Sequence, residues 1–259
     1  MYRKTTILFC LLLIGSFWFI SPVSADELAR IKKEGEMKIA MSGAYPPFNF
    51  INEQNEVVGF DAAIGKEIAK RLGVKPVIVT TAWDGILAGL LAKKYDTICG
   101  SMTITAKRQK AVDFVGPYYR SGRGIFIRQN ADHSSLTDLK GKYVGVTLGE
   151  THEKWARTQK GWKIKTYKGL PELLLELENG RIEAIVIDAI PGLLAIKKTK
   201  KPIKKMDLTS IDGGDVNIGI AIRKKNPQLK AAMQGALDDM MADGTYAAIS
   251  QKWIGSDIR

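Results

Sequence analysis

The sequence predicts an α/β protein of two lobes, each with a mainly parallel sheet flanked by helices, joined by a two-stranded hinge. Apolar strands alternate with amphipathic helices in the order β-α-β-α-β over residues 38–99, and the same order returns over residues 143–187. Extended apolar segments, residues 114–128 and 216–222, follow the two repeats. We expect the chain to cross between the lobes at these segments, so that its last helices return to the first lobe.

The first repeat alternates three short strands with two helices. The expected strands are residues 38–41, 77–79 and 97–99, and the expected helices are residues 60–72 and 84–93. Ile64 and Ile68 recur at helical spacing on one face of the first helix, and Gly73 ends that helix. Pro46 and Pro47 exclude a helix from the loop after the first strand.

The second repeat has the same plan. The expected strands are residues 143–146, 163–167 and 184–187, the expected helices are residues 152–158 and 171–177, and two further helices follow at residues 227–243 and 245–253. Pro171 suits the first turn of its helix, and Gly244 separates the two C-terminal helices. Residues 90–101 and 175–188 share one pattern of helix end, polar turn and apolar strand, which supports two α/β units of the same plan.

These elements suggest where the chain divides. The expected parts are a leader at residues 1–25, a discontinuous first lobe at residues 26–120 and 219–259, and a second lobe at residues 121–218, with hinge segments near 119–126 and 213–220.

The first residues have the pattern of a secretory signal peptide. Arg3 and Lys4 give a basic start, residues 7–20 are almost entirely apolar, and a small residue, Ala25, stands where cleavage is expected. The alternative is an uncleaved anchor helix, although the apolar run is short for a membrane span. We expect a cleaved leader and therefore a periplasmic or secreted protein.

The composition narrows the classes of partner. The formal net charge is +12, or +10 without the two cations of the leader, and lysines are densest at residues 197–205. Such a stretch fits either an anionic partner or a solvated helix end and loop, and export together with the lack of interleaved aromatic residues favours the second. We therefore expect no nucleic-acid partner.

Cys99 is the one cysteine outside the leader and is expected to be a buried, inert thiol.

Polar and aromatic residues gather where the predicted strands end. Ligands of open α/β sheets bind outside the carboxyl ends of the strands, so these residues are candidates for a shared cleft. A guanidinium such as that of Arg108 can clamp a carboxylate, a carboxylate such as Asp188 can face an ammonium, and aromatic rings can form the walls. Taken singly, each residue has an equally good structural explanation. Arg108 could form an ion pair at the surface, and Trp83 could be an ordinary core residue. The candidate ligand-binding residues are Tyr45, Trp83, Ser101, Met102, Thr103, Arg108, Glu150, Thr151 and Asp188.

A series of motifs extends this picture along the chain. In order they are AYPPFNF at 44–50, VGFD at 58–61, WDGI at 83–86, SMTITAKR at 101–108, LKGKYVGV at 139–146, GRIEA at 180–184, GIAIRK at 219–224 and DGTY at 243–246. With them the chain resembles the polar amino-acid-binding proteins of ABC importers, the group of the histidine-, lysine/arginine/ornithine- and glutamine-binding proteins. The resemblance implies a type II periplasmic-binding-protein fold. It also implies a receptor that closes on an L-amino acid and delivers it to a membrane permease.

The resemblance implies roles for single residues. Arg108 would bind the α-carboxylate, with help from Ser101, Thr103 and backbone amides near Thr151. Asp188 would bind the α-ammonium.

The same resemblance concerns the side chain of the ligand. Tyr45 and Trp83 would pack around it. Members that select cationic side chains often carry Asp three residues before Tyr45, where this chain has Ser42, and this argues against lysine or histidine. Glu150 stands where the family commonly has a small or hydroxyl residue. It either contacts a cationic or amide side chain or faces solvent, so arginine, glutamine and other polar amino acids remain open.

Two other functions compete with this interpretation. Cyclohexadienyl dehydratase resembles these proteins and uses a catalytic Glu after its Asp-Ala-Ile run, but Pro191 stands there in this chain and cannot transfer a proton. His133 and His152 are expected at the surface, and no metal or nucleophile motif occurs, so neither an enzyme nor a cofactor is expected.

The second alternative is a ligand-binding sensory module. No membrane helix or signalling domain follows Arg259, and this favours a free, monomeric receptor.

Overall fold

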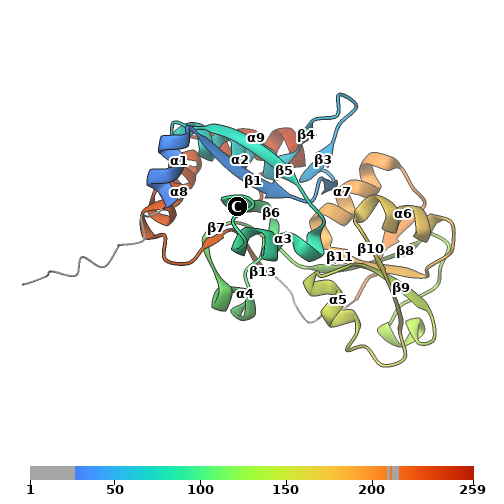
Figure 1. Cartoon of the computed structure of the whole chain (residues 1–259). Coiled ribbons are helices and arrows are strands. Elements are labelled where there is room, and N and C mark those ends of the chain that lie inside the picture. Colours follow the sequence, from blue (N-terminus) through green and yellow to red (C-terminus); the bar gives the residue numbers. More distant parts are fainter. Residues whose placement is uncertain (1–26, 209–210, 212–215) are drawn as a thin grey trace, which may run out of the picture.

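The computed structural model describes residues 27–208, 211 and 216–259, and these residues form two lobes (Figure 1). The leader expected at residues 1–25 lies outside the described residues, as does part of the second expected hinge segment. Within the described ranges, no helix has both the length and the apolar character needed to cross a membrane.

The first lobe is built on a five-stranded sheet in the order β5-β1-β6-β13-β7. Its strands are β1 (Glu36–Met41), β5 (Lys75–Thr80), β6 (Thr97–Thr103), β7 (Val112–Ser121) and β13 (Val216–Arg223). β1 pairs in parallel with β5 and β6, whereas β13 runs antiparallel between β6 and β7. Every residue of β6 is buried, as expected of a central strand covered on both faces.

The second lobe repeats this arrangement in the order β10-β9-β11-β8-β12. Its strands are β8 (Arg123–Arg128), β9 (Tyr143–Thr147), β10 (Lys163–Tyr167), β11 (Ala184–Asp188) and β12 (Ile203–Lys205). β9 pairs in parallel with β10 and β11, and β8 runs antiparallel between β11 and β12. The fourth strand is thus the reversed one in both sheets, and the predicted fold class of two mainly parallel sheets is confirmed.

Helices cover both sheets. Those of the first lobe are α1 (Glu27–Glu34), α2 (Phe60–Arg71), α3 (Trp83–Leu91), α4 (Ala106–Ala111), α8 (Pro227–Ala242) and α9 (Thr245–Ile254). Those of the second lobe are α5 (Thr151–Ala156), α6 (Leu170–Glu178), α7 (Ala189–Thr199) and a 3₁₀ turn, η1 (Leu136–Leu139). The strongly periodic helices begin and end close to the predicted positions. Three helices, α1, α4 and α7, were not predicted, because they are short, polar or lysine-rich at one end.

A small antiparallel sheet follows β1 and was not predicted. It consists of β2 (Ala44–Tyr45), β3 (Asn49–Ile51) and β4 (Val57–Val58). Gly59 connects this sheet to α2 with φ +122°, and a Cβ there would lie 2.4 Å from the carbonyl oxygen of Phe48. Only glycine fits this approach, so the sheet is held firmly against the start of α2.

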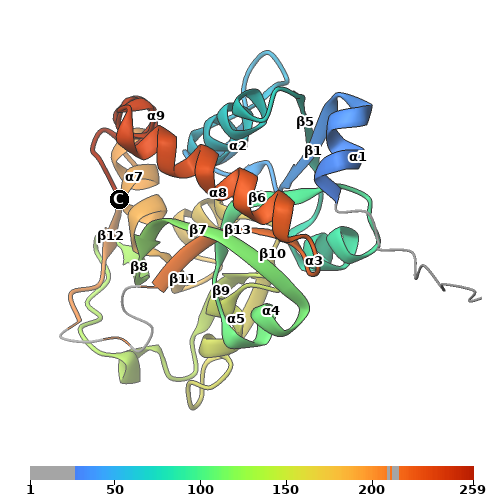
Figure 2. The same cartoon turned by 90° about the vertical axis from the view of Figure 1, so that its left-hand side faces the viewer.

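The C-terminal helices pack on elements of the first sheet and its helices. α8 packs on β7 and α9 packs on α2 (Figure 2). The ring of Phe60 lies 5.7 Å from the ring of Tyr246 on α9, and the hydroxyl of Tyr246 donates a hydrogen bond to the carbonyl oxygen of Tyr118. Phe60 also stacks on Tyr118, so one aromatic cluster joins three distant parts of the chain.

The chain passes between the two sheets abruptly. β7 ends at Ser121 and β8 begins at Arg123, so Gly122 alone separates strands of different sheets. The backbone amide of Ala189, just after β11, donates to the carbonyl oxygen of Gly122 at 2.7 Å. The return passage runs from β12 to β13.

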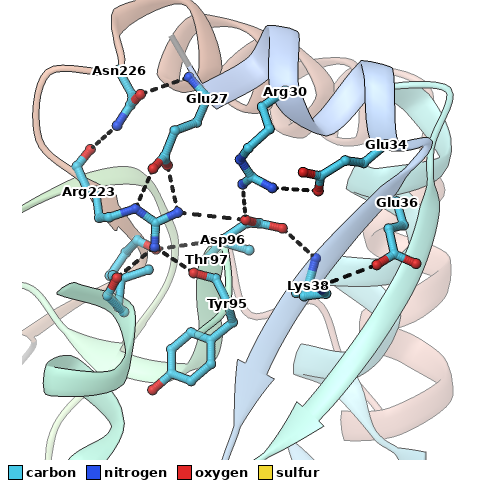
Figure 3. Close-up of polar contacts among 12 residues, drawn as sticks. Glu27, Arg30, Glu34, Glu36, Lys38, Tyr95, Asp96, Thr97, Arg223 and Asn226 are labelled. Carbon is cyan, nitrogen blue, oxygen red and sulfur yellow. Dashed lines mark hydrogen bonds and ion pairs between the residues drawn. The ribbon is translucent and has the colours of Figure 1, made fainter. Parts of the chain in front are cut away.

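A buried ion pair fixes the start of the described chain (Figure 3). The guanidinium of Arg223 on β13 binds both carboxylate oxygens of Glu27 on α1, at 2.5 and 2.7 Å. It also donates to the carbonyl oxygens of Leu90 and Tyr95. Asp96 receives a hydrogen bond from Arg30 and another from the backbone amide of Lys38, so one polar network joins α1, β1 and β13.

We expect Arg223→Met to lower the free energy of unfolding by about 3–5 kcal/mol, because Glu27 would remain buried without its cation. Urea denaturation followed by circular dichroism measures this. Lys224→Met is the matched control: the neighbouring pair of Lys224 and Asp113 is exposed, and its loss should cost less than about 1 kcal/mol. Equal effects of the two substitutions would contradict the assignment.

Candidate functional site

A narrow cavity lies between the two lobes. The first lobe contributes Ser42, Ala44, Tyr45, Trp83, Gly100, Ser101, Thr103 and Arg108, and the second contributes Thr147, Glu150, Thr151, His152, Lys168, Gly169 and Asp188. Of the predicted site residues, only Met102 is missing from this lining.

Met102 points the other way along β6. Its side chain is buried among Ile86 and Leu90 in the core of the first lobe. Side chains alternate across a strand, so Ser101 and Thr103 line the cavity while Met102 faces the opposite side of the sheet. The prediction that Met102 contacts the ligand is therefore corrected.

Arg108 is held in place by the residues just before it. Its backbone amide donates to the hydroxyl of Thr105, which caps α4, and its Nη1 donates to the carbonyl oxygen of Thr103 at 2.9 Å. The guanidinium carbon lies 5.8 Å from the ring centroid of Trp83. Burial lowers the pKa of Arg108, and the charges of Glu150 and Asp188 in the other lobe oppose this shift. The half-buried cation thus lies within the field of the carboxylates of the other lobe.

Asp188 connects the two lobes. Its Oδ2 accepts a hydrogen bond of 2.6 Å from the hydroxyl of Tyr45 in the first lobe. Its Oδ1 lies 3.1 Å from Nε2 of His152, an ion-pair distance without hydrogen-bond geometry. Burial disfavours the charged carboxylate, but His152, the hydroxyl of Tyr45 and the charge of Arg123 outweigh burial and lower the pKa of Asp188. The carboxylate is therefore ionised at neutral pH.

His152 is buried, and the prediction that it lies at the surface is wrong. It is 4% exposed on α5, beside Asp188. Its Nδ1 is also buried, and no residue in the described part of the chain bonds to it. His152 and Ala156 lie one helical turn apart and both face inward. That spacing was the sequence signal for a buried face. A helix of six residues, however, is too short for its periodicity to show which side chains are buried.

Glu150 stands directly before α5. Its Oε2 is buried, and within the described ranges it has no hydrogen-bond partner. Burial, with the charge of Asp188, raises the pKa of Glu150 to about 7, although His152 and Arg108 act in the opposite direction. The sequence left open whether Glu150 contacts the ligand or faces solvent. In the structure, Glu150 lines the cavity.

Asp61 supports the floor of the site and was not predicted. It accepts hydrogen bonds from Ser101 at 2.8 Å, from Asn49 at 2.7 Å and from Tyr118 at 2.6 Å. Burial raises the pKa of Asp61 to about 6, and these three bonds oppose the shift. Because the hydroxyl proton of Ser101 is directed to Asp61, that hydroxyl can accept a hydrogen bond from a ligand but has no proton left to donate.

Two glycines bring the backbones of the lobes together. A Cβ on Gly169 would lie 2.6 Å from the carbonyl oxygen of Ala44, and a Cβ on Gly149 would lie 2.9 Å from the Cα of Asp84. Both distances are far inside van der Waals contact, so neither side chain could be added without separating the lobes. The structure therefore shows a closed arrangement around the cavity.

Comparisons with known proteins agree on one family. The model of the bacterial extracellular solute-binding proteins, family 3, matches residues 37–256. The L-cystine-binding protein TcyJ of Escherichia coli K12 is 36% identical over 239 residues, covering 90% of this chain and 89% of the relative.

Solved structures show the same relationship. An ancestral arginine-binding protein bound to glutamine superimposes with a TM-score of 0.80 at 37% identity, over 86% of this chain and 99% of the other. The ancestral amino acid-binding protein AncCDT-1, a precursor of cyclohexadienyl dehydratase, gives a TM-score of 0.82 at 35% identity, over 88% and 99%. With this fold and this cavity, the chain belongs to the bacterial extracellular solute-binding proteins, family 3.

Proposed function

We propose that this protein is an extracytoplasmic receptor that closes on an L-amino acid and delivers it to the permease of an ABC importer. The observation that carries the proposal is the placement of Arg108 and Asp188, opposite charges on separate lobes, at one enclosed cavity. Relatives of similar length are named for binding cystine and arginine, which supports an amino acid as the ligand class.

The two charges suit the two ends of a zwitterion. The guanidinium edges of Arg108 that are not bonded to Thr103 can pair with an α-carboxylate in bidentate fashion. Oδ1 of Asp188 can accept from an α-ammonium, and the hydroxyl of Ser101 can accept from the same group. Tyr45 and Trp83 then form the walls around the ligand side chain.

We infer that binding couples to closure of the lobes. Arg108 belongs to the first lobe and Asp188 to the second, so a zwitterion gains both contacts only when the lobes meet. We place the hinge near residues 119–126 and 213–220, with the first lobe formed by residues 26–120 and 219–259 and the second by residues 121–218. We also propose that the protein is exported to the periplasm or the medium and acts as a monomer. The permease would then recognise the closed form.

A screen of the twenty L-amino acids by thermal unfolding tests the ligand class. We expect at least one to raise the Tm by about 5–10 °C at a hundredfold excess over its Kd, because only the folded receptor binds it. Arg108→Ala or Asp188→Ala should weaken binding about 100-fold or more, because each leaves a buried charge without its partner. Arg181→Ala is the control, since Arg181 is exposed and does not line the cavity. Failure of all twenty amino acids would overturn the proposal.

The requirement for closure gives a second prediction. Gly169 has an extended backbone, so alanine fits its conformation, but the added Cβ would overlap Ala44 of the other lobe. We expect Gly169→Ala to weaken amino-acid binding about tenfold or more in calorimetry, with the Tm of the ligand-free protein nearly unchanged. Gly235→Ala on α8 is the control, because no atom lies within 4 Å of its Cβ position. Unchanged affinity in Gly169→Ala would argue against full closure.

We further infer that the protein is not an enzyme. Pro191 is buried in the first turn of α7, directly after Asp188, Ala189 and Ile190, and it carries no group that could transfer a proton. Incubation with prephenate or arogenate should yield no aromatic product by absorbance or chromatography. Product formation that requires His152 would instead establish a dehydratase.

A further inference from the structure

We propose that a second groove at the junction of the lobes, the junction groove, binds an acidic, amphipathic segment of a partner protein. The first lobe contributes the loop after β2, β3 and the end of α9, and the second contributes the start of α6 and the end of α7. Figure 2 shows α7 close to α9. The junction groove shares no residue with the cavity that Arg108 and Asp188 line, so it is a separate site.

The floor of the junction groove is apolar and comes from both lobes. Phe50 and Trp253 of the first lobe pack edge to face, with ring centroids 6.1 Å apart, and both side chains are only partly buried. Leu174 and Leu194 of the second lobe line the same groove. Apolar surface that is left open in this way, with a polar rim, is typical of a place where another molecule binds.

Lysines from both lobes line the groove beside this floor. They are Lys197, Lys198 and Lys201 of the second lobe and Lys252 of the first. Three of the four belong to the lysine-dense stretch at residues 197–205, for which the sequence favoured a solvated helix end. The structure instead brings part of that stretch together with a lysine and two aromatic rings from the other lobe.

The ammonium groups lie at the edge of the apolar floor. Nζ of Lys198 is 5.2 Å from the ring centroid of Phe50, and Nζ of Lys252 is 5.3 Å from that of Trp253. None of the described residues that line the groove is acidic, and within the described chain only Lys201 of the four lysines pairs with a carboxylate, from Glu178. The groove is therefore complementary to anionic groups.

These features together select one class of occupant. A small anion such as phosphate would meet the lysines but leave the apolar floor open. A single fatty chain would cover the floor but bring one negative charge to several cations. A peptide segment with apolar side chains on one face and carboxylates on either side of them satisfies both, in the way that an amphipathic helix fits an apolar groove.

The complete groove requires the closed arrangement of the lobes. Lys198 belongs to the second lobe and Phe50 to the first, so their contact is lost when the lobes separate. A segment that contacts both lobes therefore binds the closed form more tightly than an open one. Because the groove and the cavity have no residue in common, the site does not depend on which ligand the cavity binds.

Fluorescence anisotropy of a labelled peptide mixed with the purified protein tests the proposal. The probe is a helical peptide of about four turns, with leucines along one face and glutamates on both sides of them. We expect saturable binding that weakens about fivefold or more when NaCl rises from about 50 to 300 mM, because the lysines are at the surface. A peptide of the same composition in scrambled order should bind about tenfold more weakly, because it cannot present its leucines together.

Substitutions in each lobe show whether both contact the peptide. Lys252→Gln alone, and Lys197→Gln with Lys198→Gln, should each weaken binding about threefold or more, and all three together about tenfold or more. The matched control replaces three exposed lysines that do not line the groove, Lys110, Lys142 and Lys230, with Gln; it removes the same charge and should change binding less than about twofold. An unchanged Tm shows that the variants fold.

Three results would overturn the proposal. Equal losses in the triple variant and its control, or equal binding of the two peptides, would mean that net charge alone attracts the probe. An effect of substitutions in one lobe only would contradict a segment that bridges the lobes. Binding of phosphatidylglycerol vesicles through the same lysines, without binding of the peptide, would identify a membrane surface instead. Failure of every amino acid to bind the cavity would overturn the proposed function and leave this test unchanged.

Discussion

Burial of opposite charges at the junction of two lobes is the constraint on which this molecule depends. A carboxylate such as that of Asp188 is costly inside a protein unless another group compensates it, and its hydrogen-bond donor, Tyr45, belongs to the other lobe. The arrangement of the lobes is therefore tied to the pairing of these groups.

The repeated sheet explains why the groups meet. In both lobes the second and third strands of the sheet run in parallel, and their carboxyl ends point to the cavity. Thr103 ends β6 in the first lobe, and Asp188 ends β11 in the second. Short polar networks behind these ends, such as that of Asp61 with Ser101 and Tyr118, fix the side chains before a ligand arrives. The strands and the first turns of the helices therefore position the side chains of the site.

Much of this could be predicted from sequence, because strand ends and charged motifs are local features. Arg108 and Asp188 were candidates because they follow predicted strands, and the family resemblance gave them their expected roles. Met102 was included among the candidates between Ser101 and Thr103 without regard to the alternation of side chains along a strand. His152 and Asp61 were missed for a different reason: their importance comes from contacts with residues far away in the chain, and neither short helices nor single acids reveal such contacts.

The insertion of β13 between β6 and β7 has a consequence for how the chain matures. Residues 216–223 occupy an interior position in a sheet whose other strands all come from residues 36–121. The amino-terminal half of the molecule thus lacks a central strand until almost the whole polypeptide has emerged, whereas β8 to β12 of the other sheet are contiguous. The order of completion is therefore reversed with respect to the order of synthesis.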